Sequence, residues 1–129
     1  MPLTEHGLLT QAALGEDSSR QFKADVHNAE SLVAEMATFA NTDGGTIFSG
    51  VTEHGNVPGF SCEAVARINQ LISNAASQMV RSPLTVLTEN VLLANGNLVI
   101  VLTVPKGLDK PYFDKNGVIW LKTGPTSAG

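Results

Sequence analysis

The sequence predicts an α+β fold, in which a mixed, largely antiparallel sheet carries two main helices in a single-domain sandwich. Three observations support this fold class. Segments with strand character outnumber those with helical character. Two long segments repeat apolar residues every three or four positions, as helices with one buried face do. Turn signals such as Asn95-Gly96 join consecutive strands into hairpins, which makes neighbouring strands antiparallel.

The first forty residues are predicted to form a weak helix, a short strand and a strong helix. Thr4–Leu14 is a short helix that Gly15 ends. Arg20–Val26 places apolar Phe22 among charged neighbours, which is typical of a strand with one solvent-exposed face. Asn28 caps the strong helix, because its side-chain oxygen accepts a hydrogen bond from the first turn. This helix runs to Ala40, and its apolar stripe consists of Leu32, Val33, Met36, Ala37 and Ala40.

The stretch Phe39–Val51 joins that helix to a buried strand, and we call it the joint. Thr42-Asp43 satisfies backbone groups locally, and Gly44-Gly45 supplies the positive φ that ends a helix. Thr46–Val51 is nearly all apolar or small, which predicts a strand covered on both faces. A phosphate-binding loop is not expected here, because its glycines precede a helix N-terminus, whereas these follow a helix C-terminus. The joint is therefore predicted to be a helix stop and a tight turn.

The middle of the chain is predicted to hold a second main helix and a hairpin. Ser61 caps the helix, which Ser82-Pro83 ends. Leu84–Leu93 and Leu98–Val104 are predicted strands on either side of Asn95-Gly96.

The end of the chain is predicted to form a last hairpin and a tail. Tyr112-Phe113 and Val118–Leu121 flank a turn at 114–117. We expect one domain over residues 1–124, with 125–129 as a flexible tail or the start of a linker.

Charge is unevenly distributed along the 129 residues, which carry a net charge of −4. Residues 1–65 hold two basic and nine acidic residues, whereas residues 66–129 hold six basic and three acidic residues. A basic edge is predicted from the lysines of the last third, with ordinary solubilising lysines as the alternative. These lysines are Lys106, Lys110, Lys115 and Lys122.

Composition also predicts where the protein works. A single cysteine, Cys62, rules out an internal disulfide framework and suits a reducing compartment. The sequence has neither an apolar run of membrane-spanning length nor the features of a signal peptide. We therefore expect a cytoplasmic protein without a membrane partner.

Four motifs follow one another in a recognisable order. They are Gly15-Glu16 with Gln21-Phe22-Lys23; Phe39, Ala40, Asn41, Thr42, Asp43, Gly44 and Gly45 with Gly50-Val51; Val104-Pro105 with Lys110-Pro111-Tyr112; and Lys122-Thr123-Gly124. Together they resemble the Schlafen AlbA-like domain, a family of DNA-binding domains of bacterial transcriptional regulators formerly called divergent AAA. The resemblance spans about Gly15 to Gly124. Its central motif is the specific part, and the others gain weight from their order.

The resemblance implies a nucleic-acid-binding module for transcription regulation, with DNA favoured over RNA as partner. Longer family members often continue into a winged-helix or other C-terminal regulatory region at the point where this sequence ends, and the sequence is compatible with either a fragment of a longer regulator or a free-standing domain. No catalysis and no cofactor are expected, and the former ATPase-like label of the family finds no support because no phosphate loop is present. We expect phosphate contacts from Arg20, Lys23, Lys110 and Lys122, which position a protein on nucleic acid without reading its sequence. A homodimer would double this modest basic surface.

Two alternatives remain open at the level of sequence. Some animal Schlafen relatives resemble metal-dependent ribonucleases, for which Glu16 and Glu53 would be the carboxylates here. The family's usual glutamate is Gln21 in this chain, and an amide brings no charge to a divalent cation. The histidines lack metal-ligand spacing, so no metal site is expected. The second alternative is a protein–protein interaction module, which the acidic first half favours.

Overall fold

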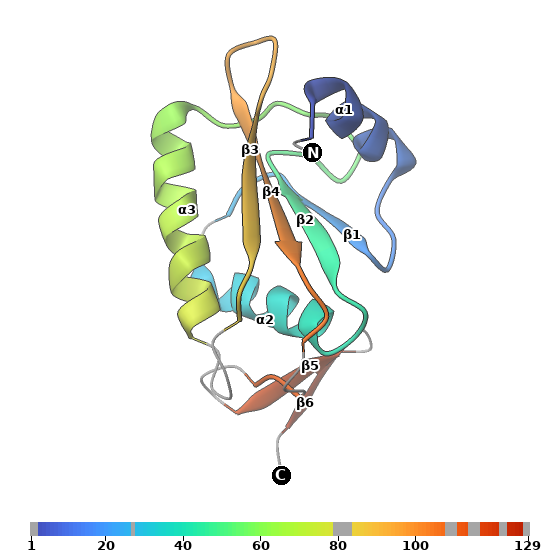
Figure 1. The fold of residues 1–129 in the computed structure, drawn as a ribbon, viewed down its shortest axis with the longest axis vertical. Coiled ribbons are helices and arrows are strands. Elements are labelled where there is room, and N and C mark those ends of the chain that lie inside the picture. Colours follow the sequence, from blue (N-terminus) through green and yellow to red (C-terminus); the bar gives the residue numbers. More distant parts are fainter. Residues whose placement is uncertain are drawn as a thin grey trace.

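The computed structural model describes residues 3–26, 28–78, 84–107, 111–113, 117–121 and 124–127. Its elements follow the predicted order closely, and the α+β fold class is confirmed (Figure 1). In chain order they are α1 (Glu5–Leu14), β1 (Arg20–Lys23), α2 (Ala29–Ala40), β2 (Gly45–Ser49), α3 (Cys62–Ser77), β3 (Leu87–Leu92), β4 (Leu98–Val104), β5 (Val118–Leu121) and β6 (Gly124–Ser127).

The main sheet is mixed and mostly antiparallel, as predicted. Its four strands lie in the order β1-β2-β4-β3. β1 and β2 are parallel, and α2 supplies the crossover that a parallel pair needs. β4 runs antiparallel to both β2 and β3, so β1 and β3 are the two outer strands of this sheet.

Two apolar cores lie on opposite faces of the sheet. On one face α2 and α3 pack with Ile47, Ile100 and Leu102. On the other face α1 packs with Phe48 and Val101 among others. Since successive strand residues point to opposite faces, the apolar run of β2 is buried on both sides, which confirms the prediction for this strand.

Helix starts agree with the caps expected from the sequence. Asn28 Oδ1 accepts a hydrogen bond of 2.8 Å from Ser31 N, and Ser61 Oγ accepts one of 3.3 Å from Ala64 N. The helix expected from Thr4 also begins with a cap, because Thr4 Oγ1 accepts from Gly7 N at 3.1 Å. In the described part of the chain, none of the helices has the length and apolar character needed to cross a membrane.

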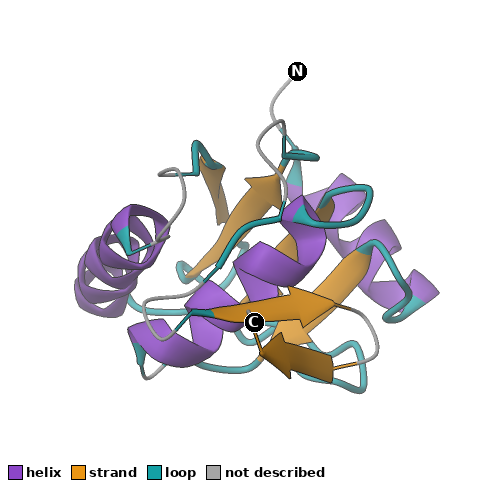
Figure 2. Cartoon of the chain, turned by 90° about the horizontal axis from the view of Figure 1, so that it is seen from below, coloured by secondary structure: helices purple, strands orange, loops and turns teal. Residues whose placement is uncertain are grey.

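The C-terminal strands differ from the prediction. β5 pairs antiparallel with β6 in a separate two-stranded sheet, where the sequence had suggested a partner at Tyr112-Phe113. Residues 114–116 and 122–123 lie outside the described residues. The sequence does not predict Gly124–Ser127 as a strand because it lacks apolar alternation. The boundary expected at residue 124 therefore falls at β6, and the division into domain and tail stays a prediction. β5 contacts α2, and the pair lies below this helix (Figures 1 and 2).

Candidate nucleic-acid interface

The joint forms hydrogen bonds with the segment that follows β4. Asn41 follows the last residue of α2, and its amide makes two bonds to one backbone position. Asn41 Nδ2 donates to Tyr112 O at 3.1 Å, and Tyr112 N donates to Asn41 Oδ1 at 2.6 Å. Gly107 N also donates to Ala40 O at 2.9 Å. The end of α2 thereby holds both Gly107 and Tyr112, which lie on either side of Lys110 in the sequence.

Gly44 and Gly45 of the joint stand where neighbouring atoms leave no room for a side chain. Gly44 has a φ of +82°, and a Cβ atom there would lie 2.8 Å from Val104 O. A Cβ atom on Gly45 would lie 2.3 Å from the ring of Phe39. Thr42 Oγ1 donates to Thr38 O at 2.9 Å, and Asp43 is exposed. The joint is thus built to bring the helix end against the exit of β4.

Arg20, a predicted phosphate ligand, is engaged within the protein. Its guanidinium donates to Gln11 Oε1 at 2.9 Å, to Gly15 O at 3.0 Å and to Asp17 Oδ2 at 2.9 Å. The side chain is 16% exposed. These bonds tie β1 to the end of α1. A phosphate at Arg20 would have to compete with them.

Asp17 is ordered by the same turn. Its carboxylate accepts hydrogen bonds from Ser19 N at 2.8 Å and Ser19 Oγ at 2.9 Å, besides the pair with Arg20. The bond from the Ser19 backbone, followed by that from the Ser19 hydroxyl, lowers the pKa of Asp17 below its usual 3.8, and Arg20 adds to the effect. The turn therefore favours the charged carboxylate.

Lys23, a second predicted phosphate ligand, pairs with a carboxylate that sequence reasoning missed. Lys23 Nζ lies 2.8 Å from Glu35 Oε1, and the two side chains are 19% and 18% exposed. Gln21 Nε2 donates to the same oxygen at 3.2 Å. The other oxygen, Glu35 Oε2, is buried with no hydrogen-bond partner in the described part of the chain. β1 is thereby bound to α2 by one charged and one neutral side chain.

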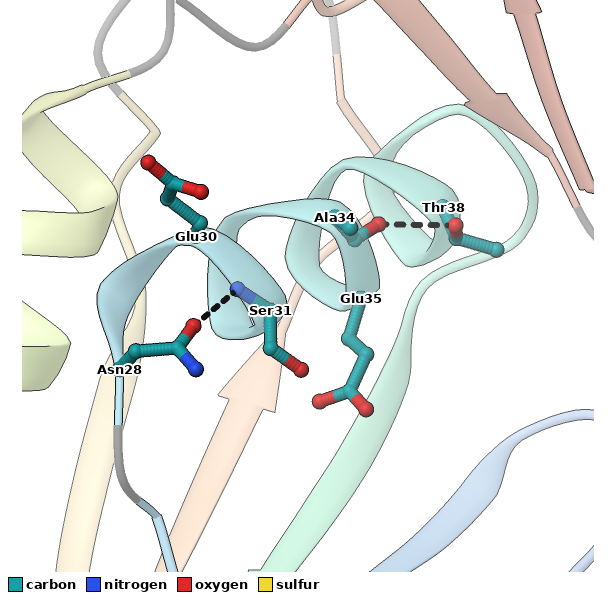
Figure 3. Close-up of a pocket in the computed structure, with 6 residues that line it drawn as sticks. All are labelled: Asn28, Glu30, Ser31, Ala34, Glu35 and Thr38. Carbon is teal, nitrogen blue, oxygen red and sulfur yellow. Dashed lines mark hydrogen bonds between the residues drawn. The ribbon is translucent and has the colours of Figure 1, made fainter.

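A signal for Glu35 exists in the sequence. Ser31, Glu35 and Thr38 recur at helical spacing, which forms a polar stripe beside the apolar one. In Figure 3 the side chains of Asn28, Ser31 and Glu35 point to the same side of α2, while Glu30 points away. They line an open cavity of about 430 Å³.

A second open cavity, also about 430 Å³, brings three predicted motif residues together. Glu16, Gln21 and Phe39 all line it, together with Arg20 and Asp17. Thr38 lines both cavities, so they lie next to each other along α2. The residues of the two cavities include more acids than bases, which does not favour phosphate binding there.

The lysines that follow β4 are described only in part. Lys106 is exposed and makes no ion pair, whereas Arg20, Lys23 and Arg67 all do, in the part of the chain that the structure describes. Its backbone N would lie 2.9 Å from a Cβ atom on Gly44, which places Lys106 beside the joint. Lys110 and Lys122 fall outside the described residues, so their roles stay predictions.

The two candidate catalytic carboxylates have separate local partners. Glu16 Oε1 accepts a hydrogen bond of 2.8 Å from Phe22 N. Glu53 lies 3.6 Å from His54 Nε2 on an exposed turn, where its side chain is 78% exposed. Among the described residues, no cluster of three or more carboxylate, histidine or cysteine side chains is arranged to hold a metal ion. The described geometry therefore gives the ribonuclease alternative no specific support.

The described residues form an α+β domain with a mixed four-stranded sheet, helices on both faces and a helix–strand joint that anchors the segment after β4. The chain belongs to the family described as Schlafen, AlbA_2, which it matches over residues 16–128. Among curated proteins, none matches the chain significantly.

Two solved structures share the fold. One is the DIP2311 protein from Corynebacterium diphtheriae, with a TM-score of 0.60 and 20% identity over 96% of this chain. The chain spans only 24% of that protein. The other is the N-terminal domain of a protein from Nitrosomonas europaea described as related to the ATP-dependent DNA helicase RecG. It has a TM-score of 0.60 and 18% identity over 84% of this chain and 78% of that domain. The family fits a nucleic-acid-related domain, and the two neighbours share the fold of this chain.

Proposed function

We propose that this chain is a nucleic-acid-binding domain of a transcriptional-regulator-like protein, which binds DNA in preference to RNA and works by binding rather than by catalysis. Membership of the Schlafen AlbA_2 family carries the proposal. The likeness to the N-terminal domain of a helicase-related protein supports it at the level of the fold.

We assign the main phosphate contacts to the segment that follows β4. A lysine contributes most to phosphate binding when no carboxylate already neutralises it. Arg20 and Lys23 both have such a carboxylate, whereas exposed Lys106 has none among the described residues. Lys110 comes between Gly107 and Tyr112, both of which the joint anchors. Lys115 and Lys122 continue the same basic stretch of sequence.

Arg20 and Lys23 have a different part in this proposal. The hydrogen bonds of Arg20 to Gln11 and Gly15 hold the outer strand β1 against the end of α1, and the ion pair of Lys23 holds it against α2. Both cations reach a phosphate only by exchanging one anionic partner for another. With a net charge of −4 for the chain, the affinity is modest and depends strongly on salt.

Fluorescence anisotropy with short duplexes of DNA and of RNA tests the proposal. Four phosphate contacts on DNA predict a slope of about −3.6 for the logarithm of the binding constant against the logarithm of salt concentration. Lys106→Ala should make that slope shallower by about 0.9, because one contact is lost. Arg67→Ala is the matched control, because Arg67 belongs to α3 and already pairs with Asp25, so its loss should leave the slope unchanged. Absence of binding to either duplex at low salt would refute the proposal, and equal slopes for the two variants would refute the assigned segment.

A further inference from the structure

β3 is an outer strand with unused hydrogen-bonding groups. Leu93 N donates to Asn97 O at 2.8 Å across the hairpin. This bond determines which residues of β3 direct their backbone N–H and C=O groups toward β4. Because the direction alternates along an antiparallel ladder, Leu87, Glu89 and Val91 bond to β4. Residues 88, 90 and 92 then point their backbone N–H and C=O groups outward, where no described residue forms a bridge or strand with them.

This edge also lacks the features that usually prevent edge-to-edge pairing. β3 contains no lysine, arginine or proline. Its one charged residue is Glu89, whose carboxylate accepts a hydrogen bond of 2.6 Å from Leu3 N. Leu92 is 65% exposed, and Thr88 and Asn90 are exposed as well. The other outer strand, β1, instead carries Arg20 and Lys23.

A cavity lined by both polar and apolar residues lies beside the start of the same edge. It has a volume of about 350 Å³ and opens between α3 and the chain that enters β3. The lining residues are Asn69, Ile72, Ser73 and Ala76 of α3 with Leu84, Thr85, Val86 and Thr88. Thr88 and Leu92 pair with Leu102 and Leu98, which pack in the α2–α3 core, so both residues are on the sheet face that carries α3. The exposed leucine and the cavity therefore share one edge and one face.

We propose that β3 pairs antiparallel with β3 of a second copy of this chain, about a two-fold axis at Asn90. The two main sheets then become one continuous sheet. Asn90 lies opposite its own symmetry mate, and Leu92 of each copy lies opposite Thr88 of the other. Because Thr88 lines the cavity, each Leu92 side chain reaches the cavity of its partner, which makes the contact reciprocal as an isologous interface requires.

Charge and overlap select this register among those that the two-fold axis allows. A register centred on Glu89 would place two carboxylates directly opposite each other, which is destabilising. A register centred on Val91 would pair only the last residues of the two strands. The register centred on Asn90 places Glu89 opposite Val91 and overlaps most of β3.

The dimer does not depend on nucleic-acid binding, and its test involves none. Sedimentation velocity and light scattering over a wide range of concentration should show a monomer–dimer equilibrium. Leu92→Lys should weaken dimerisation at least about 100-fold, because the symmetry applies the lost apolar contact and the added charge twice. Leu14→Lys is the matched control, because Leu14 is also 65% exposed but lies on α1. A wild-type chain that stays monomeric throughout, or equal effects of the two substitutions, would overturn the proposal.

Disulfide cross-linking tests the register directly. In a Cys62→Ser background, Asn90→Cys places two cysteines opposite each other at a Cα separation of about 5.5 Å, which a disulfide spans. Oxidation should give a covalent dimer much faster than it does for Asn56→Cys, which changes an exposed residue in the loop between β2 and α3. Equal rates for the two variants would overturn the register.

Discussion

Replacing Asn41 by alanine should loosen the C-terminal segment from the end of α2. The side-chain amide of Asn41 bonds both the N–H and the C=O of Tyr112, at 2.6 and 3.1 Å. Tyr112 is 4% exposed and belongs to the core that α2 and α3 share. The substitution therefore removes a donor and an acceptor from partly buried backbone groups, which water cannot fully replace without opening the segment.

The magnitude follows from the two lost partners. A buried backbone group that loses its hydrogen bond costs about 1–3 kcal/mol, and partial access to water puts each group at the lower end of that range. We expect the free energy of unfolding to fall by about 2–4 kcal/mol, a large part of the 5–15 kcal/mol typical of a domain.

Urea denaturation followed by circular dichroism measures the global loss, and hydrogen exchange locates it. The amides of Gly107 and Tyr112 should exchange faster in Asn41→Ala, while those of β4 change less. Asn56→Ala is the matched control, because Asn56 is exposed and should change stability by less than about 0.5 kcal/mol. If Asn41→Ala behaves like this control in both measurements, the joint does not anchor the segment.

Two further substitutions test the joint and the turn before β1. Gly45→Ala places a Cβ atom 2.3 Å from the Phe39 ring and should cost about 2–3 kcal/mol by urea denaturation. Gly96 has a φ of +88°, and a Cβ atom added there would have no other atom within 4 Å. Gly96→Ala should therefore cost only about 1–2 kcal/mol, from the positive φ alone. Equal losses of stability for Gly45→Ala and Gly96→Ala would contradict the packing argument. The lowered pKa of Asp17 contributes stability that is complete above its unfolded-state pKa and is lost as pH falls through the lower folded-state pKa. Asp17→Asn should therefore flatten the acid side of the stability profile, and an NMR titration midpoint at or above 3.8 in the wild type would contradict this assignment.

The sequence predicts the main elements well where local signals and burial agree. Asn28, Ser61 and Asn95-Gly96 are strong local signals, and the structure uses each as expected. The run Thr46–Val51 was correctly interpreted as a strand buried on both faces, because an apolar run without alternation has no solvent-exposed side. The sequence does not predict β6 because Gly124–Ser127 has no apolar alternation, so nothing in it indicates the pairing with β5.

The partners of the charged residues could not be predicted in the same way. Arg20 and Lys23 are typical phosphate ligands by residue type, yet their carboxylate partners come from a turn and from a helix twelve residues further on. Only the parallel pairing of β1 with β2 and the crossover through α2 bring Lys23 to Glu35. The sequence therefore shows which residues are basic, whereas the topology determines which of them are already paired with a carboxylate.

The identity of residue 21 decides whether the cluster of Gln21, Lys23 and Glu35 between β1 and α2 binds a cation or only holds the strand. Gln21 donates to the same oxygen of Glu35 that accepts from Lys23, so one carboxylate satisfies a cation and an amide together. A glutamate at position 21, as the family resemblance would have it, could not donate this bond. It would also add a second carboxylate beside a single ammonium, and such an excess of negative charge is relieved by binding a cation. With glutamine, the charges of Lys23 and Glu35 balance, and the bonds from β1 to α2 serve to hold the strand. The substitution thus favours a structural role for this cluster and leaves the lysines after β4 as the better candidates for contact with nucleic acid.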